Sequence, residues 1–183
     1  MAVVVIAGSG RGAGKTAVGC ALMAALPEFR WAAVKITPHG HENLEGIQEE
    51  FDRSSVKDTG RYLMAGARRS FLATGSVLGI REAAEGMDAL LVESNQVSAG
   101  LLAGAEERRV GLAVLSGIVE LWKKSLWDCV CGMDALVLTA GLSPDQLPDA
   151  IRGKRLFWMA PGRWSSPELV GFVGRRIRGY PMR

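Results

Sequence analysis

The chain has 183 residues, of which 48% are apolar and 22% are charged, a composition typical of one globular domain with a substantial core. The net charge of +3, from 22 basic and 19 acidic side chains, is too balanced to indicate a nucleic acid or a membrane surface as the partner, so we expect neither. The three cysteines are too few for a disulfide framework and suit a reducing compartment. We expect a cytoplasmic protein, because we see no signal peptide and no apolar run long enough to span a membrane.

The first stretch of the chain is typical of a strand, a glycine-rich loop and a helix. An apolar, β-branched run over residues 2–7 predicts the strand, and a helix is expected from about residue 14 to residue 26. Between them lies Gly-Ser-Gly-Arg-Gly-Ala-Gly-Lys-Thr, residues 8–16. In this context the segment predicts a phosphate-binding loop, or P-loop, and therefore a nucleoside-triphosphate site.

The residue types of this loop suit a bound triphosphate. Glycines let successive backbone N–H groups converge on an anion, and the following helix directs its positive dipole end at the phosphates. Lys15 is expected to reach the β- and γ-phosphates, and the Thr16 hydroxyl to ligate Mg²⁺. The expected nucleotide-binding residues are Gly10, Arg11, Gly12, Ala13, Gly14, Lys15, Thr16 and Ala17. Ser9 stands where the usual pattern has glycine, and the alternative is an ordinary glycine-rich turn.

A second strand is expected over residues 31–37, which makes a right-handed parallel βαβ unit with the first strand and helix. Lys35 near its end would be costly to bury unpaired, so we expect it to face a phosphate or an acid. Residues 38–57 are polar and predict a long functional loop. Its His39 and His41 lack an evident third metal ligand, so a solvated or substrate-contacting loop is the preferred interpretation over a metal site.

The rest of the chain alternates helices with apolar strands. Further strands are expected over 70–74, 88–93, 110–115, 135–139 and 156–159, and further helices over 57–67, 77–87, 119–130, 147–152 and 167–177. Continuous apolar strands that alternate with helices predict an α/β fold of the P-loop NTPase class, with a mainly parallel sheet and helices on both faces. We expect residues 1–183 to form a single nucleotide-binding domain.

Two carboxylates complete the expected site. Glu93 ends a buried strand where P-loop proteins usually carry a metal-facing acid; the alternative is a carboxylate facing solvent. Asp58 either caps its helix or orients Mg²⁺, and the two roles are compatible. The expected catalytic residues are Lys15, Asp58 and Glu93, and the expected metal ligands are Thr16, Asp58 and Glu93. Ser94 and Asn95 are candidates to bind a water or the ribose.

The base of the nucleotide is not decided by the sequence. The Asn-Lys-x-Asp element that reads guanine in many GTPases is absent. Residues 139–145 follow a late strand where a base-reading loop is expected, and Asp145 is the candidate within them. Both GTP and ATP therefore remain open as the cofactor.

Several segments resemble MobB-type proteins, the nucleotide-binding adaptors of molybdopterin-guanine dinucleotide biosynthesis. Residues 34–41, Val-Lys-Ile-Thr-Pro-His-Gly-His, are similar to that family's Val-Ile-Lys-His-Thr-His-His segment. Three further segments follow the family in the same order. Phe51-Asp52 is similar to its Phe-Asp, and residues 57–67 are similar to its Gly-Lys-Asp-Ser followed by Ala-Gly-Ala. Leu91-Val92-Glu93 is similar to its Val-Glu-Gly strand end. Ile36, Pro38 and Ser94 depart from the family pattern, and the resemblance covers roughly the first half of the chain.

The resemblance implies a P-loop fold, often dimeric, that binds GTP and hydrolyses it slowly in support of a partner nucleotidyltransferase of the molybdenum cofactor. It assigns Lys15 and Thr16 to phosphate and Mg²⁺, with Asp58 and Glu93 near the metal. The competing hypothesis is an ATP-dependent small-molecule kinase or ligase whose acceptor is held by the 38–57 loop.

Overall fold

The computed structural model describes residues 1–37, 46–74, 79–96, 108–139 and 141–179. His39 and His41 lie outside these ranges. Within them, none of the helices is both long enough and apolar enough to cross a lipid bilayer.

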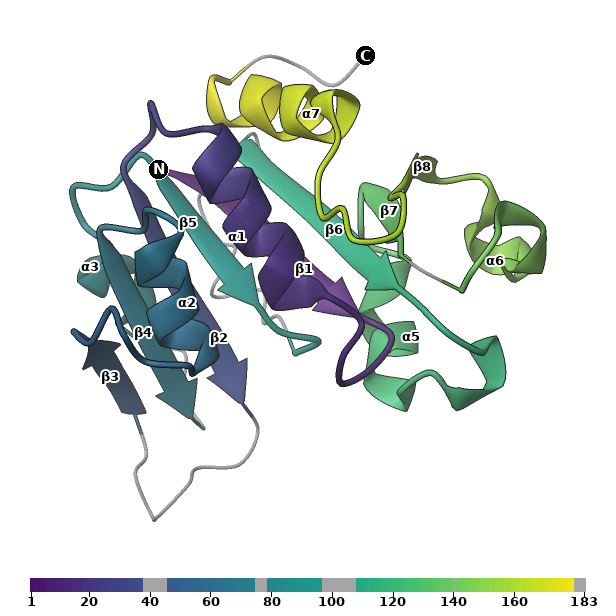
Figure 1. Ribbon diagram of the computed structural model, residues 1–183, viewed down its shortest axis with the longest axis horizontal. Coiled ribbons are helices and arrows are strands. Elements are labelled where there is room, and N and C mark those ends of the chain that lie inside the picture. Colours follow the sequence, from purple (N-terminus) through teal and green to yellow (C-terminus); the bar gives the residue numbers. More distant parts are fainter. Residues whose placement is uncertain (38–45, 75–78, 97–107, 140, 180–183) are drawn as a thin grey trace.

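A single sheet runs through the described part of the chain. Its eight strands lie in the order β3-β4-β2-β5-β1-β6-β7-β8 (Figure 1). The strands are β1 (Ala2–Gly8), β2 (Trp31–Thr37), β3 (Gly46–Glu50), β4 (Arg69–Thr74), β5 (Ala89–Glu93), β6 (Arg109–Leu115), β7 (Ala135–Leu138) and β8 (Arg155–Trp158). All neighbours pair in parallel except β3, which runs antiparallel to β4.

Helices cover both faces of this sheet, which is why the central strands read as unbroken apolar runs. Alternate residues of β1 enter the two layers of core: Val4 and Ile6 pack under one set of helices, and Val3 and Val5 under the other. The first set is α1 (Lys15–Ala25), α2 (Asp58–Met64) and α7 (Pro167–Ile177), and the second is α3 (Ile80–Ala83), α5 (Lys124–Val130) and α6 (Asp149–Arg152). The expected mainly parallel α/β fold is confirmed.

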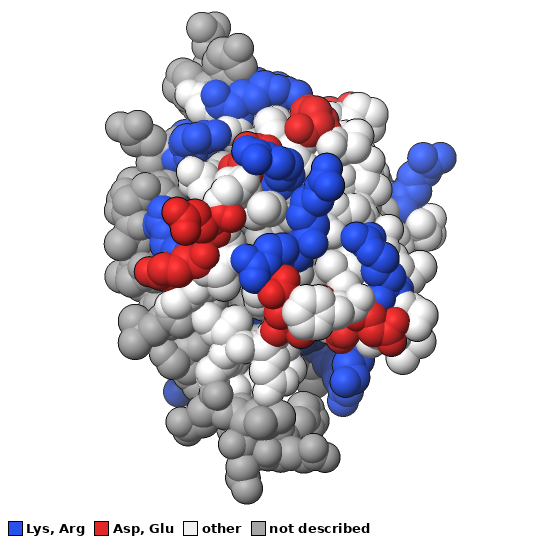
Figure 2. All heavy atoms as spheres, turned by 90° about the vertical axis from the view of Figure 1, so that its left-hand side faces the viewer, with Lys and Arg blue, Asp and Glu red and all other residues white. Residues whose placement is uncertain are grey.

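Part of the expected 38–57 loop is in fact a strand. Residues 46–50 form β3 at the sheet edge, where Ile47 packs against the core and Glu49 pairs with Arg69 at 2.6 Å. With one apolar residue inside the strand, its alternation is too weak to recognise. On this side of the molecule, basic and acidic side chains are interspersed rather than gathered by sign (Figure 2).

Several expected helices are shorter than predicted: 57–67 is α2 and 147–152 is α6, and two further helices differ more strongly. Residues 119–130 divide into the 3₁₀ turn η2 (Val119–Leu121) and α5, because Trp122 turns into the core and the Lys123 N–H donates to Ser9 O at 2.9 Å. Residues 77 and 78 of the expected 77–87 helix lie outside the described ranges. In the remainder, α3 lies between Gly79 and Gly86, whose φ values of 81° and 79° a right-handed helix cannot contain.

The expected cap of α2 is also wrong. Lys57 occupies the N-cap position, and Asp58 is the first helical residue. The carboxylate of Asp58 turns toward Lys35 on β2.

Candidate functional site

The carboxyl ends of three neighbouring strands bring the expected residues together. In the register of the parallel ladders, Glu93 at the end of β5 lies opposite Ile6 of β1 on one side and Lys35 of β2 on the other. The glycine-rich loop leaves β1 at the same edge, directly after Gly8. Open α/β sheets place their ligands at this edge.

Glycine is required at three places in and beside the loop. Gly12 and Gly14 have φ values of 80° and 99°, which side chains disfavour. A Cβ on Gly14 would also lie 2.4 Å from the ring of Trp164, and a Cβ on Gly8 would lie 2.7 Å from Cγ of Lys15. The loop backbone is thus approached closely by both side chains.

Ser9, the departure from the usual P-loop pattern, fixes the loop to β6. Its N–H donates to Val114 O at 3.0 Å, and its hydroxyl accepts from Ser116 N–H at 3.1 Å and donates to Ser116 O at 3.3 Å. Glycine could not make the two side-chain bonds. The serine therefore adds a contact that the usual residue would lack.

Asn95 fixes the loop on the opposite side. The last backbone bond between β5 and β1 runs from Ser94 N–H to Ile6 O at 3.0 Å. Beyond it, Asn95 Oδ1 accepts from Gly8 N–H at 2.8 Å, and its Nδ2 donates to Gly8 O at 2.9 Å. The side-chain amide thus continues the ladder as a backbone peptide would. Asn95 also lines a cavity beside the loop, and its expected role toward a water or the ribose stays a prediction.

Lys15 folds back over the loop, where its Nζ donates to Gly10 O at 2.9 Å. Burial lowers the pKa of Lys15; Glu93 opposes this shift, and the charges of Lys35 and Lys123 add to it. An anion beside Lys15 would favour its charged form.

Glu93 is the buried centre of the site. Only 3% of it is exposed, so the solvent-facing alternative does not hold. Its Oε2 accepts from the Thr16 hydroxyl at 2.7 Å and from the hydroxyl of Tyr62, which α2 contributes. Burial and the Glu93 charge raise the pKa of Tyr62 well above its ordinary value, so the phenol remains a donor.

Lys35 joins the two carboxylates. Its ammonium contacts Asp58 Oδ2 and lies 3.3 Å from Glu93 Oε1, and Arg61 lies 3.5 Å from Asp58 Oδ1. Although burial disfavours its charge, Glu93 and Asp58 outweigh burial and raise the pKa of Lys35. Burial acts to raise the pKa of Asp58, but the Lys35 hydrogen bond and charge outweigh it and lower that pKa. The expectation that Lys35 faces an acid is confirmed.

The oxygen donors beside the loop suit a Mg²⁺ ion that arrives with a nucleotide. Such an ion takes one or two protein oxygens and completes its octahedron with phosphate and water. Thr16 and Glu93 offer two oxygens 2.7 Å apart. No group of three or more His, Cys, Asp or Glu residues is placed to cage a metal in the described ranges. The residues therefore fit a nucleotide-borne Mg²⁺ better than a resident metal.

Two neighbouring cavities share the lining residues Arg11, Lys15, Lys35 and Glu93. The first, of about 470 Å³, has the loop and the start of α1 on one side and Trp164 on another; it is lined by Arg11, Gly12, Gly14, Lys15, Thr16, Ala17, Lys35, Asp58, Arg61, Glu93 and Trp164. The second, of about 420 Å³, is lined by Arg11, Lys15, Lys35, Ile36, Thr37, Glu93, Ser94, Asn95, Gln96, Lys123 and Ser125. We call them the loop cavity and the basic cavity.

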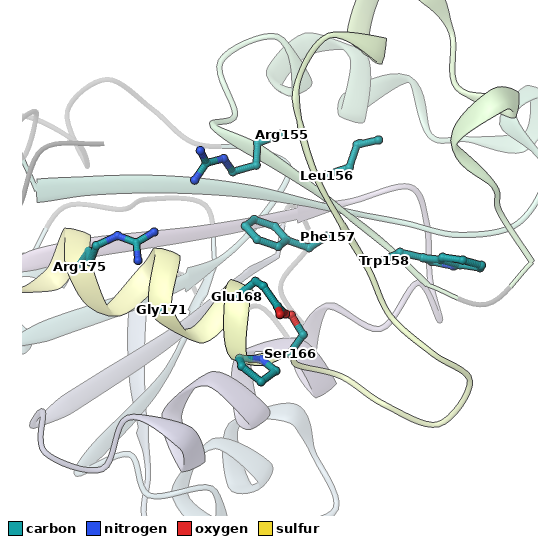
Figure 3. A pocket seen from close by; sticks show the side chains of 9 residues that line it. Arg155, Leu156, Phe157, Trp158, Ser166, Glu168, Gly171 and Arg175 are labelled. Atoms are coloured by element: carbon teal, nitrogen blue, oxygen red, sulfur yellow. The ribbon is translucent and has the colours of Figure 1, made fainter. Parts of the chain in front are cut away.

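A further hollow lies between β8 and α7 (Figure 3). Phe157 lies near its middle, and Arg155 packs over the ring of Phe172 at 5.2 Å. It shares no lining residue with the two cavities at the loop. Its walls have no glycine-rich backbone, so we place the candidate site at the loop.

The sequence did not indicate four side chains near the loop. Tyr62 shares a helix with Asp58 four residues earlier, a spacing that places both on one face and could have drawn attention to it. Trp164 and Lys123 come from distant loops and carry no local signal. The fourth of these side chains is Arg61, which contacts Asp58.

In the predicted base-reading segment, Thr139 contacts the loop. Thr139 Oγ1 lies 3.2 Å from Ala13 O, to which it can donate. Asp145 accepts from the Ser143 hydroxyl and lines neither cavity.

Comparison with known proteins supports the architecture. No family model and no curated protein matches the sequence. Among solved structures, LpxK from Aquifex aeolicus, determined in complex with ATP, is similar with a TM-score of 0.51 and 17% sequence identity, over 86% of this chain and 53% of LpxK. This chain has the P-loop NTPase fold. The chain spans about half the length of LpxK. At 17% identity, the similarity between the two proteins concerns the fold alone.

Proposed function

We propose that this chain binds a nucleoside triphosphate with Mg²⁺ in the loop cavity and hydrolyses it. The observation that carries the proposal is the lining of this cavity: a glycine-rich backbone with Lys15 and Thr16 on one side, and an aromatic ring, Trp164, on another. Backbone N–H groups and a lysine suit phosphates, and an aromatic face suits a nucleobase. Trp164 is 38% exposed, so part of its ring is available for stacking.

Five polar residues of the site then have a role. Lys15 leaves Gly10 O to bind the β- and γ-phosphates, while Thr16 and Glu93 hold Mg²⁺. The bound metal would neutralise the charge that develops on the phosphate oxygens. Lys35 positions Glu93, and Asp58 acts through Lys35 by holding its ammonium in place.

The finer assignment follows the sequence resemblance. A MobB-type adaptor would bind GTP, hydrolyse it slowly and serve a nucleotidyltransferase of the molybdenum cofactor. The second candidate is an ATP-dependent small-molecule kinase or ligase, and one observation favours it: the basic cavity lies next to the loop cavity and shares Lys15 with it. The similar LpxK structure, which holds ATP, supports an adenine nucleotide.

The first test is calorimetric titration with GTP and with ATP, each with and without Mg²⁺. We expect Lys15→Ala to weaken binding by about 10- to 100-fold, because it removes charge-assisted hydrogen bonds. Trp164→Ala should weaken it by about 10-fold through lost stacking. Trp158→Ala is the matched control, because this tryptophan is 68% exposed and lines neither cavity at the loop.

The titration distinguishes the candidates as well. Tighter GTP binding favours the adaptor, and tighter ATP binding favours the kinase or ligase. Phosphate release that stays slow with every small acceptor but accelerates with a molybdenum-cofactor enzyme would exclude the kinase. If wild-type protein binds neither nucleotide, the proposed function is wrong.

A further inference from the structure

The basic cavity carries an excess of positive charge, and part of it lies outside the proposed nucleotide site: Arg11, Lys15 and Lys35 line both cavities, whereas Lys123 lines the basic cavity alone. Four cations line it: Arg11 from the loop, Lys15 from α1, Lys35 from β2 and Lys123 from the segment before α5. Among the described residues of the lining, Glu93 is the single acid. Its two oxygens already contact Thr16, Tyr62 and Lys35.

Apart from Lys15, which the proposed function assigns to the triphosphate, two of these cations have no acidic partner in the described part of the chain. Neither Arg11 nor Lys123 forms an ion pair there, whereas Lys35 is bound by Asp58. Both side chains are exposed at the mouth of the cavity. The charge of Lys123 also contributes to the lowered pKa of Lys15, which indicates that the cations lie within electrostatic reach of one another.

The position of Lys123 is fixed by the fold. Its backbone N–H donates to Ser9 O at 2.9 Å, and the preceding Trp122 is anchored by a hydrogen bond from its indole to Ser116 O at 3.0 Å. Ser125 accepts from Asn95 Nδ2 at 3.2 Å, which leaves the hydroxyl hydrogen of Ser125 as a neutral donor at the cavity wall. The hydrogen bonds of Ser9 and Asn95 thus hold Lys123 and Ser125 beside the P-loop.

We infer that the basic cavity binds an anionic small molecule, with a phosphate or carboxylate group, as a second ligand beside the triphosphate. Its volume of about 420 Å³ is within the range of small-molecule sites. The inference rests on the proposed function, because it assumes that a triphosphate occupies the neighbouring loop cavity, which Lys15 also lines. It deepens the kinase or ligase candidate by naming the charge of the second ligand.

Three C3 compounds test the inference, because they differ chiefly in their charged group: glycerol, glycerate and glycerol 3-phosphate. Each is titrated by calorimetry into the full chain, with and without the non-hydrolysable β,γ-imido analogues of ATP and GTP plus Mg²⁺. We expect glycerate or glycerol 3-phosphate to bind at least about 10-fold more tightly than glycerol. Equal affinity for the charged and neutral compounds would overturn the inference.

Variants locate the binding. Lys123→Ala and Lys123→Gln should each reduce the anion affinity at least about fivefold, as expected for a lost charge-assisted contact. Lys124→Ala is the matched control: Lys124 is the exposed neighbour at the start of α5, and it lines neither cavity at the loop. It should change the anion affinity by less than about twofold. Equal effects of the Lys123 and Lys124 variants would refute the assignment.

The two proposals fail separately in this design. If the imido analogues bind but no charged compound binds better than glycerol, the basic cavity is wrong and the nucleotide site stands. If no analogue binds, the proposed function fails, and Lys123-dependent anion binding without nucleotide would still support the cavity.

Discussion

Replacement of Asn95 by alanine is the most direct test of how the loop is held. The substitution removes the two bonds to Gly8, at 2.8 and 2.9 Å, and a third to Ser125 at 3.2 Å. Gly8 is buried, so both of its backbone groups would lose their partner away from bulk water. An unpaired buried polar group costs about 1–3 kcal/mol, so we expect a total loss of about 2–4 kcal/mol.

The free energy of unfolding is measured by urea denaturation, with the thermal midpoint as a second readout. A loss of about 3 kcal/mol corresponds to a midpoint lower by about 6–12 °C for a chain of this size. Ser94→Ala is the control, because within the described residues the Ser94 hydroxyl bonds only in its own turn, to Gln96. We expect it to cost less than about 1 kcal/mol. An Asn95→Ala cost below about 0.5 kcal/mol, or one equal to the control, would refute the view that this amide extends the ladder.

Three further outcomes are expected. Asp58→Asn should destabilise the fold by about 1 kcal/mol at pH 7. Because the contact with Lys35 lowers the pKa of Asp58, the difference in stability between the variant and the wild type should disappear as the pH falls below 3.8. A stability difference that persists in acid would contradict this role of Asp58. Gly14→Ala should lower the free energy of unfolding, measured by urea denaturation, by at least about 1 kcal/mol more than Gly12→Ala. Both glycines have positive φ, but only at Gly14 would the added Cβ meet a tryptophan ring. Equal costs would count against that contact. Burial raises the pKa of Cys20 to about 11. At pH 8, iodoacetamide should therefore alkylate Cys20 about 100-fold more slowly than free cysteine, as followed by mass spectrometry. Labelling at the rate of free cysteine would show that burial does not raise this pKa.

Much of the fold could be predicted because the strong patterns are local. The strand over 31–37 and the helix over 167–177 have the expected bounds. Ser166 caps that helix and accepts from Leu169 N–H at 3.3 Å, with Pro167 at its first position, so its start was visible in the sequence. Elements with such signals need no knowledge of the rest of the chain.

Two of the elements that were wrong depend on distant contacts. Strand β3 exists because β4 offers an open edge and Arg69 pairs with Glu49. The break at Trp122 and Lys123 depends on the P-loop segment more than 100 residues earlier, through Ser9 and the Ser116 turn. No local pattern encodes either contact.

The candidate site divides in the same way. Lys15, Thr16 and Glu93 were predicted from motif and strand end, and Lys35 from the cost of a buried charge. The roles of Tyr62 and Asn95 could not be predicted, because each depends on a neighbour brought close only by the sheet.

The two pairs of hydrogen bonds that flank the loop have a consequence for the thermodynamics of binding. Asn95 holds Gly8 from the β5 side, and Ser116 holds Ser9 from the β6 side, before any nucleotide arrives. A loop that is already in place loses little conformational entropy when it closes on phosphate. Amide hydrogens of residues 8–9 should therefore exchange slowly in the free protein. Two strand ends that need not touch the ligand would in this way set part of its affinity.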